Sequence, residues 1–117
     1  MIEKNFEYAI SSLKTIEKVI SDGNADINHM ILPNGDALPI HNSNSNVYII
    51  IIKGILTIKL ENQSPNKYTE GNILNVPFNT KMHLYNENKD LLEFFVIKSP
   101  SPQNYICLLY TSDAADE

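Results

Sequence analysis

The sequence contains one cysteine and no arginine. Cys107 alone cannot form a disulfide within the chain, which excludes a disulfide-stapled scaffold. All nine basic residues are lysines, scattered singly along a chain with a net charge of −5, so no surface for tracking nucleic-acid phosphates is expected. The apolar run 47–52 is far shorter than the roughly 20 residues of a membrane-spanning helix. The first residues also lack the basic and apolar regions of a secretory signal, so we expect a cytoplasmic protein.

Length and composition predict one globular domain. The chain has 117 residues, of which 43% are hydrophobic, and single domains usually have roughly 100 to 150 residues. We assign residues 1–106 to this domain. The last segment, 107–117, contains no asparagine, lysine or isoleucine, although the preceding chain uses all three heavily. It resembles, residue by residue, the translated transposon adapter of short-read sequencing libraries, and we therefore treat it as a non-native tail.

The domain shows the pattern of an all-β protein. Short apolar and alternating segments recur at intervals of roughly 8 to 12 residues, separated by turns rich in Asn, Ser, Gly and Pro, which is typical of a sandwich or barrel. Ser99–Pro102 cannot continue a ladder and ends the last strand. The expected strands cover residues 15–20, 25–31, 37–41, 47–53, 56–61, 67–69, 73–76, 82–86 and 91–98.

The N-terminal segment has a different pattern. Phe6, Ile10 and Leu13 are spaced as on one face of a helix, so a short helix is expected over residues 3–13.

Two motifs carry a family resemblance. The spacing of Gly35, His41, Ser43, Val47 and Gly54 is similar to that of the first cupin motif, in which a glycine, two histidines, a glutamate and a second glycine occupy these positions. The second cupin motif is matched in spacing by Gly71, Pro77, Asn79, Met82 and Asn86. The chain thus resembles a small single-domain cupin of the RmlC-like jelly-roll type. The resemblance implies a cupin-type jelly-roll β-barrel.

The motif positions lack most of the metal ligands. In cupins that bind metal, the histidines and the glutamate hold a divalent ion, but this chain has His41, Ser43, Val47 and Met82 at those four positions. A hydroxyl, a hydrocarbon and a thioether are poor ligands for such an ion, so no metal or other cofactor is expected. Enzyme activity is not the favoured reading. The alternative is a metal-dependent isomerase or oxygenase that uses His41 and a displaced His83.

Strand alternation predicts what faces the barrel interior. If Val47 points inward, Ile49 and Ile51 do so too. Mostly apolar walls with a few polar groups are typical of a small-molecule pocket, but the same residues also suit a filled core. The predicted pocket is His41, Ser43, Val47, Ile49, Ile51, Met82 and Asn86.

The opposite face of the same strand is also apolar, with Tyr48, Ile50 and Ile52. An uncovered apolar face predicts an interface, and small cupins commonly pair, so a homodimer is expected. The other reading is a monomer in which the N-terminal helix covers this face. The favoured function is a metal-free cupin that binds a small organic ligand in the barrel or acts as a dimeric accessory or sensor protein. A third hypothesis is a ligand-sensing module that works beside a DNA-binding protein.

Overall fold

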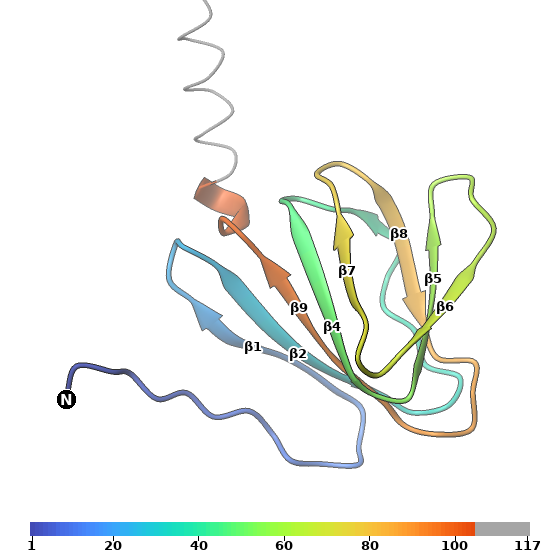
Figure 1. The fold of residues 1–117 in the computed structure, drawn as a ribbon, viewed down its shortest axis with the longest axis horizontal. Coiled ribbons are helices and arrows are strands. Elements are labelled where there is room, and N and C mark those ends of the chain that lie inside the picture. The colour runs from blue at the N-terminus through green and yellow to red at the C-terminus, as the bar shows by residue number, and fades with distance from the viewer. Residues whose placement is uncertain (105–117) are drawn as a thin grey trace, which may run out of the picture.

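The protein folds into two antiparallel β-sheets that face each other (Figure 1). The structure is a computed structural model, which describes residues 1–104. One sheet has five strands in the order β1-β2-β9-β4-β7, and the other has four in the order β3-β8-β5-β6. The strands of the described residues are β1 Thr15–Ser21, β2 Asp26–Leu32, β3 His41–Asn42, β4 Val47–Lys53, β5 Ile55–Leu60, β6 Asn66–Thr69, β7 Ile73–Val76, β8 Lys81–Tyr85 and β9 Leu92–Lys98.

The two sheets enclose one apolar core. On β4, Val47, Ile49 and Ile51 are buried, whereas Tyr48 and Ile52 on the opposite face are exposed, as side-chain alternation requires. Inward residues of the other strands complete the core: Met30, Leu32, Leu38, Leu56, Ile58, Val76, Met82, Leu84, Leu92, Phe94 and Val96. The expectation of an all-β barrel is confirmed.

Most strand predictions agree with the structure, and two segments differ. The strand expected over residues 37–41 is wrong, because only a bridge between Ala37 and Tyr85 and the two-residue strand β3 form there. Pro39 lies within this stretch and has no backbone N–H to donate to a ladder. The helix expected over residues 3–13 is also wrong, since the first fourteen residues contain no helix.

The N-terminal segment leaves the sheets as an extended trace (Figure 1). Besides its helical spacing, it carries Ile2, Phe6, Tyr8 and Ile10 at even-numbered positions, which is the spacing of one face of a strand. Ile2, Phe6, Tyr8 and Ile10 are all exposed to solvent. A short helix gains most of its stability from a packed apolar face, whereas each of these four side chains keeps about half or more of its surface exposed.

Two turns show how the chain reverses at the motif positions. Gly54 joins β4 to β5 with a φ of +85°, and a Cβ there would overlap the carbonyl oxygen of Leu91. Asn79 has a φ of +61°, the left-handed conformation, at a position where the second cupin motif has a glycine. β9 ends at Lys98, before Ser99–Pro102, as expected. The predicted tail, residues 107–117, lies outside the described residues.

Candidate ligand-binding site

The strands that carry the two cupin motifs, β3 and β8, lie side by side in the structure. His41 on β3 lies opposite Met82 on β8, so the first and second motifs are adjacent in the barrel wall. The His41 side chain is exposed to solvent, and its Nδ1 lies 2.8 Å from the carbonyl oxygen of Pro39, to which it donates. Met82, by contrast, is 2% exposed and packs in the core.

The polar members of the predicted pocket hold the backbone in place. The buried Ser43 hydroxyl donates to the carbonyl of Pro77 at 2.6 Å and accepts from the backbone N–H of Thr80 at 2.9 Å. The buried Asn86 amide donates to the carbonyls of Leu32 and Asp90 at 2.8 and 2.9 Å. These contacts tie together the loops that lead into and out of β8. Both side chains therefore have structural partners.

The apolar members of the predicted pocket lie together. Val47, Ile49 and Ile51 are fully or almost fully buried and belong, with Met82, to the continuous core between the sheets. The structure thus brings four of the seven predicted residues into one packed layer. It places Ser43 and Asn86 in the loops beside this layer and His41 at its solvent edge.

These side chains do not fit the divalent metal that many cupins hold. Val47 and Met82 lie in the apolar core, Ser43 already makes two hydrogen bonds, and His41 offers one imidazole nitrogen. Among residues 1–104, no three His, Cys, Asp or Glu side chains are grouped so that they could hold a metal ion. His83 follows Met82 on β8 and so points to the opposite face from His41. The pair in the displaced-histidine alternative therefore does not converge.

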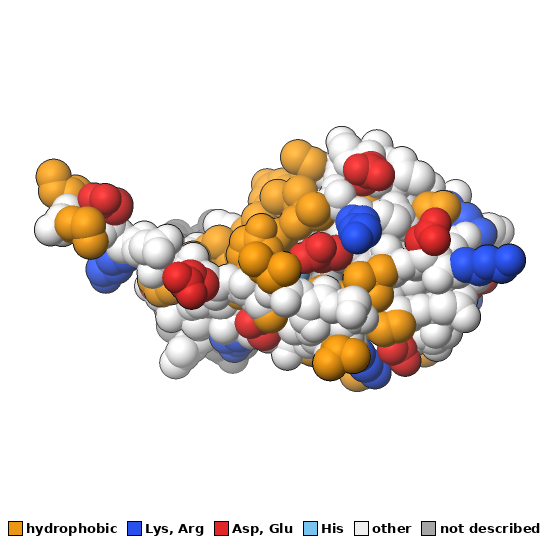
Figure 2. Space-filling view, turned by 90° about the horizontal axis from the view of Figure 1, so that it is seen from below, with side chains coloured by type: hydrophobic (Ala, Val, Ile, Leu, Met, Phe, Trp, Pro, Cys, Tyr) orange, Lys and Arg blue, Asp and Glu red, His pale blue; other side chains and the backbone are white. Residues whose placement is uncertain are grey.

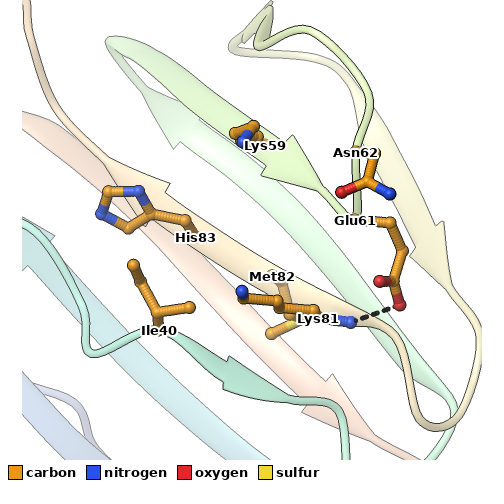
Figure 3. A pocket seen from close by; sticks show the side chains of 7 residues that line it. All are labelled: Ile40, Lys59, Glu61, Asn62, Lys81, Met82 and His83. Atoms are coloured by element: carbon orange, nitrogen blue, oxygen red, sulfur yellow. Dashed lines mark hydrogen bonds between the residues drawn. The ribbon is translucent and has the colours of Figure 1, made fainter.

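His83 instead lines a shallow groove on the outer face of the four-stranded sheet (Figure 3). The groove has a volume of about 150 Å³. Glu61 at its rim accepts a hydrogen bond from the backbone N–H of Lys81 at 2.9 Å, so this carboxylate points away from the barrel interior. The lining residues are Ile40, Lys59, Glu61, Asn62, Lys81, Met82 and His83.

A second groove opens between the sheets, where β5 and β6 of one sheet approach β7 of the other. It has a volume of about 230 Å³. Part of its wall continues the core, since Leu60, Tyr68 and Leu74 pack against the buried cluster. Ile73 and Asn75, on the other face of β7, also line it. Amide side chains lie among them. The lining residues are Ile58, Leu60, Gln63, Asn66, Tyr68, Ile73, Leu74, Asn75 and Val76.

This mouth groove, as we call it, adjoins the predicted pocket. Val76 lies opposite Val47 in the β4–β7 ladder, and Leu74 lies opposite Ile49. Asn75 on the other face of β7 donates to the carbonyl of Val47 at 3.0 Å. The sequence predicted the apolar core layer but not the groove. The distance between β6 and β7 opens the groove, and the residue pattern of neither strand indicates that distance.

The outer face of the five-stranded sheet holds a buried charged cluster. His29 on β2 is 0% exposed, with its Nδ1 2.7 Å from Glu17 Oε2 on β1 and its Nε2 2.6 Å from Glu93 Oε2 on β9. Because carboxylates only accept hydrogen bonds, both contacts need a ring that donates from both nitrogens, the imidazolium form, or one protonated carboxyl.

The N-terminal segment covers this cluster. The Tyr8 ring lies 4.7 Å from the His29 ring and 5.0 Å from Phe95, measured between centroids. The backbone N–H of Ala9 donates to Glu17 Oε2 at 2.9 Å. This bond, followed by the one from His29, holds the pKa of Glu17 below its ordinary value of 4.5.

Further along this outer face, exposed apolar side chains lie beside the polar Asn75. Tyr48, Ile52 and Ile73 are exposed on it, with Ile50 partly exposed beside them. Hydrophobic side chains gather on the body of the molecule, and the N-terminal residues project beyond it (Figure 2). The described residues include no helix with the length and apolar character needed to cross a membrane.

Two facing antiparallel sheets with cupin motif spacing define a double-stranded β-helix barrel. No family model matches the sequence. An uncharacterized protein of Methanocaldococcus jannaschii is 50% identical over 104 residues, covering 88% of this chain and 90% of the relative. The crystal structure of an RmlC-like cupin family protein with a double-stranded β-helix fold, from the same organism, matches with a TM-score of 0.86 and 50% identity over 89% of this chain and 96% of that one.

The chain therefore belongs to the RmlC-like cupin family. A cupin superfamily protein from Desulfitobacterium hafniense shares the fold at 12% identity, with a TM-score of 0.67 over 80% of this chain and 83% of that one. The predicted family and the predicted jelly-roll fold are both confirmed.

Proposed function

We propose that this protein is a metal-free cupin that binds a small organic ligand between its sheets and works in the cytoplasm as a homodimeric sensor or accessory protein. The observation that carries the ligand proposal is the mouth groove, a concave site lined by apolar side chains and amide groups in about equal measure. Ligand sites in proteins are typically concave and mostly apolar, with a few polar groups that fix orientation.

The size of the groove restricts the ligand. Its volume of about 230 Å³ lies below the roughly 300 to 1,000 Å³ of pockets for drug-sized molecules. Gln63 and Asn66 offer both donors and acceptors, and neither carries a charge. These features favour a small, uncharged organic molecule with an apolar body and a carbonyl, amide or hydroxyl group. Tyr68 adds an aromatic wall.

A matched pair of variants on β6 tests the groove. Asn66 lines the groove, whereas the next side chain, Lys67, points to the other face and pairs with Glu87 at 3.0 Å. We expect fragments from a library of small uncharged carbonyl and hydroxyl compounds to shift the amide signals of groove residues in two-dimensional NMR spectra. Asn66→Trp should abolish these shifts, and Lys67→Trp should preserve them. Absence of any binding fragment, or equal binding to both variants, contradicts the ligand proposal.

The metal-free part of the proposal rests on donor chemistry at the motif positions. Restoring the family ligands by Ser43→His, Val47→Glu and Met82→His should create a site with His41, because the motif spacing is retained. Elemental analysis should find near-stoichiometric zinc, nickel or manganese in this variant and background levels in the parent. A parent protein that carries stoichiometric metal, and loses it in His41→Ala, contradicts this part.

The homodimer proposal rests on the uncovered outer face. Ile50→Asp places a charge in the middle of this face and should dissociate the dimer, since an unpaired buried charge is costly. Lys59→Asp on the outer face of the other sheet is the matched control and should leave the dimer intact. Equilibrium sedimentation over a wide concentration range measures both. A parent protein that stays monomeric throughout removes the dimer proposal and leaves the ligand proposal standing.

A further inference from the structure

The inward face of the five-stranded sheet changes from apolar to charged at one end. On β9, Phe94 and Val96 are buried in the core, and Lys98 ends the same row of side chains. Lys98 lies opposite Asp26 on β2 and opposite Val47 on β4. Residues that lie opposite each other in a ladder share a face of the sheet. The row that fills the core therefore ends in a lysine.

A polar pocket of about 270 Å³ opens at this end of the sheet. Except for Pro102, the residues that line it are polar or charged, and they come from β1, β2, β9 and the segments that precede β4 and follow β9. We call it the end pocket. It shares no lining residue with the mouth groove.

Hydrogen bonds hold the frame of the end pocket. The turn between β1 and β2 lies beside the segment that follows β9 (Figure 1). The Ser99 hydroxyl donates to the carbonyl of Asn24 at 3.3 Å, and the Asn104 amide donates to the carbonyl of Gly23 at 2.7 Å. These bonds tie together two of the segments that surround the pocket.

The charges in the end pocket do not balance. The buried Asp26 carboxylate accepts a hydrogen bond from the Ser21 hydroxyl at 2.7 Å, and its other oxygen lies 3.5 Å from the Lys18 ammonium. Lys98 is partly buried and forms no ion pair with any other residue of the range 1–104. Two ammonium groups thus share one carboxylate, which leaves one positive charge without a counterpart.

The pKa of Lys98 agrees with this imbalance. Burial is the largest influence and lowers this pKa below its ordinary value of 10.5, attraction by Asp26 opposes the change, and repulsion by Lys18 adds to it. The surroundings of Lys98 therefore disfavour its charged form. An anion beside Lys98 would offset that effect.

We propose that the end pocket binds the carboxylate of a short organic acid between the ammonium groups of Lys98 and Lys18. One carboxylate supplies the single negative charge that the pocket lacks. The side-chain amides of Asn44 and Gln103 line the same pocket and can donate hydrogen bonds to it. Pro102 and the aliphatic stems of the two lysines offer apolar surface to a short hydrocarbon chain. The volume is smaller than that of pockets for drug-sized molecules, which restricts the ligand to a small acid.

Butyrate is the probe, added to the full chain at constant ionic strength and followed in two-dimensional NMR spectra. It should shift the backbone amide signals around Lys98 and Ser101 in a saturable manner. Lys98→Met should weaken binding by at least about tenfold, because it removes one charge-assisted contact. Lys18→Met removes the same charge without altering Lys98 and should weaken binding as well. Lys89→Met, in the exposed loop before β9, is the matched control and should change the affinity less than about twofold.

Inorganic phosphate tests the class of anion. It carries more than one negative charge at neutral pH and should bind more weakly than butyrate, because the extra charge would lie near the Asp26 carboxylate. Tighter binding of phosphate than of butyrate overturns the assignment to a carboxylate. Absence of saturable shifts, or equal binding of butyrate to the parent and to Lys98→Met, overturns the end pocket as an anion site. Asn66→Trp in the mouth groove should leave butyrate binding unchanged, so the two sites are tested separately.

Discussion

The buried His29 cluster makes the sharpest prediction about stability, because its two glutamates differ in exposure. The Glu93 side chain is 19% exposed and the Glu17 side chain 31% exposed, while the His29 ring between them is fully buried. Glu93→Ala leaves a ring N–H without its acceptor where water has little access. Glu17→Ala leaves the other N–H at the more open side, where water can replace the carboxylate.

The magnitudes follow from this difference. Leaving a buried hydrogen-bonding group without its partner usually costs about 1 to 3 kcal/mol, and more where the group is charged, so Glu93→Ala should lower the free energy of unfolding by roughly 3 kcal/mol. Glu17→Ala should cost roughly 1 to 2 kcal/mol, including the loss of the acceptor for Ala9. Glu3→Ala in the exposed N-terminal segment is the control and should change stability by less than about 0.5 kcal/mol.

Urea denaturation at neutral pH measures all three variants, and the order of the effects is the test. A Glu93→Ala variant that loses less than about 0.5 kcal/mol shows that the cluster contributes little to folding. If Glu17→Ala lowers the free energy of unfolding more than Glu93→Ala does, access of water does not determine the loss of stability. Either result refutes the reasoning from exposure.

Three further predictions concern pH, a turn and the tail. Folding lowers the pKa of Glu17, so its stabilising contribution is complete above its ordinary pKa of 4.5 and is lost as the pH falls through the lower folded-state value. In Glu17→Gln, the stability should therefore fall less steeply as the pH is lowered, which thermal denaturation at a series of pH values measures. Gly54→Ala should destabilise the protein by more than about 2 kcal/mol, because the new Cβ meets the backbone of Leu91, whereas Gly71→Ala, with a φ of +92° in open space, should cost about 1 kcal/mol in the same assay. Deleting residues 107–117 should move the thermal midpoint by less than about 4 °C, and a larger drop contradicts the assignment of this segment as a non-native tail.

The sequence predicted the barrel well because alternation and turn chemistry are local. The bounds of β4 and β7 agree with the predicted segments, and Asn79 takes the left-handed conformation that the motif spacing assigns to it. The N-terminal segment was misjudged because Phe6 and Ile10 satisfy both a helical and an alternating pattern. Only contact with the rest of the molecule decides between two such patterns.

The candidate sites were harder to predict because they depend on strand register and on space. Glu17 and Glu93 are 12 and 64 positions from His29, and they reach its ring only because β1 and β9 flank β2. The mouth groove depends on a volume between β6 and β7 that no pattern along either strand records. The motif spacing gave the position of His41 in the chain, but nothing in the sequence showed that its side chain would be exposed to solvent.

The position of β9 in the larger sheet has a consequence for how the protein is made. β9 is the last strand within residues 1–104, yet it lies between β2 and β4 and joins them. While the ribosome is still adding residues before Leu92, β2 and β4 are already present and have no common neighbour to pair with. The barrel therefore closes only after nearly all of the domain has been synthesised. Until then the unpaired backbone edges and apolar side chains of β2 and β4 are open to aggregation and to chaperones.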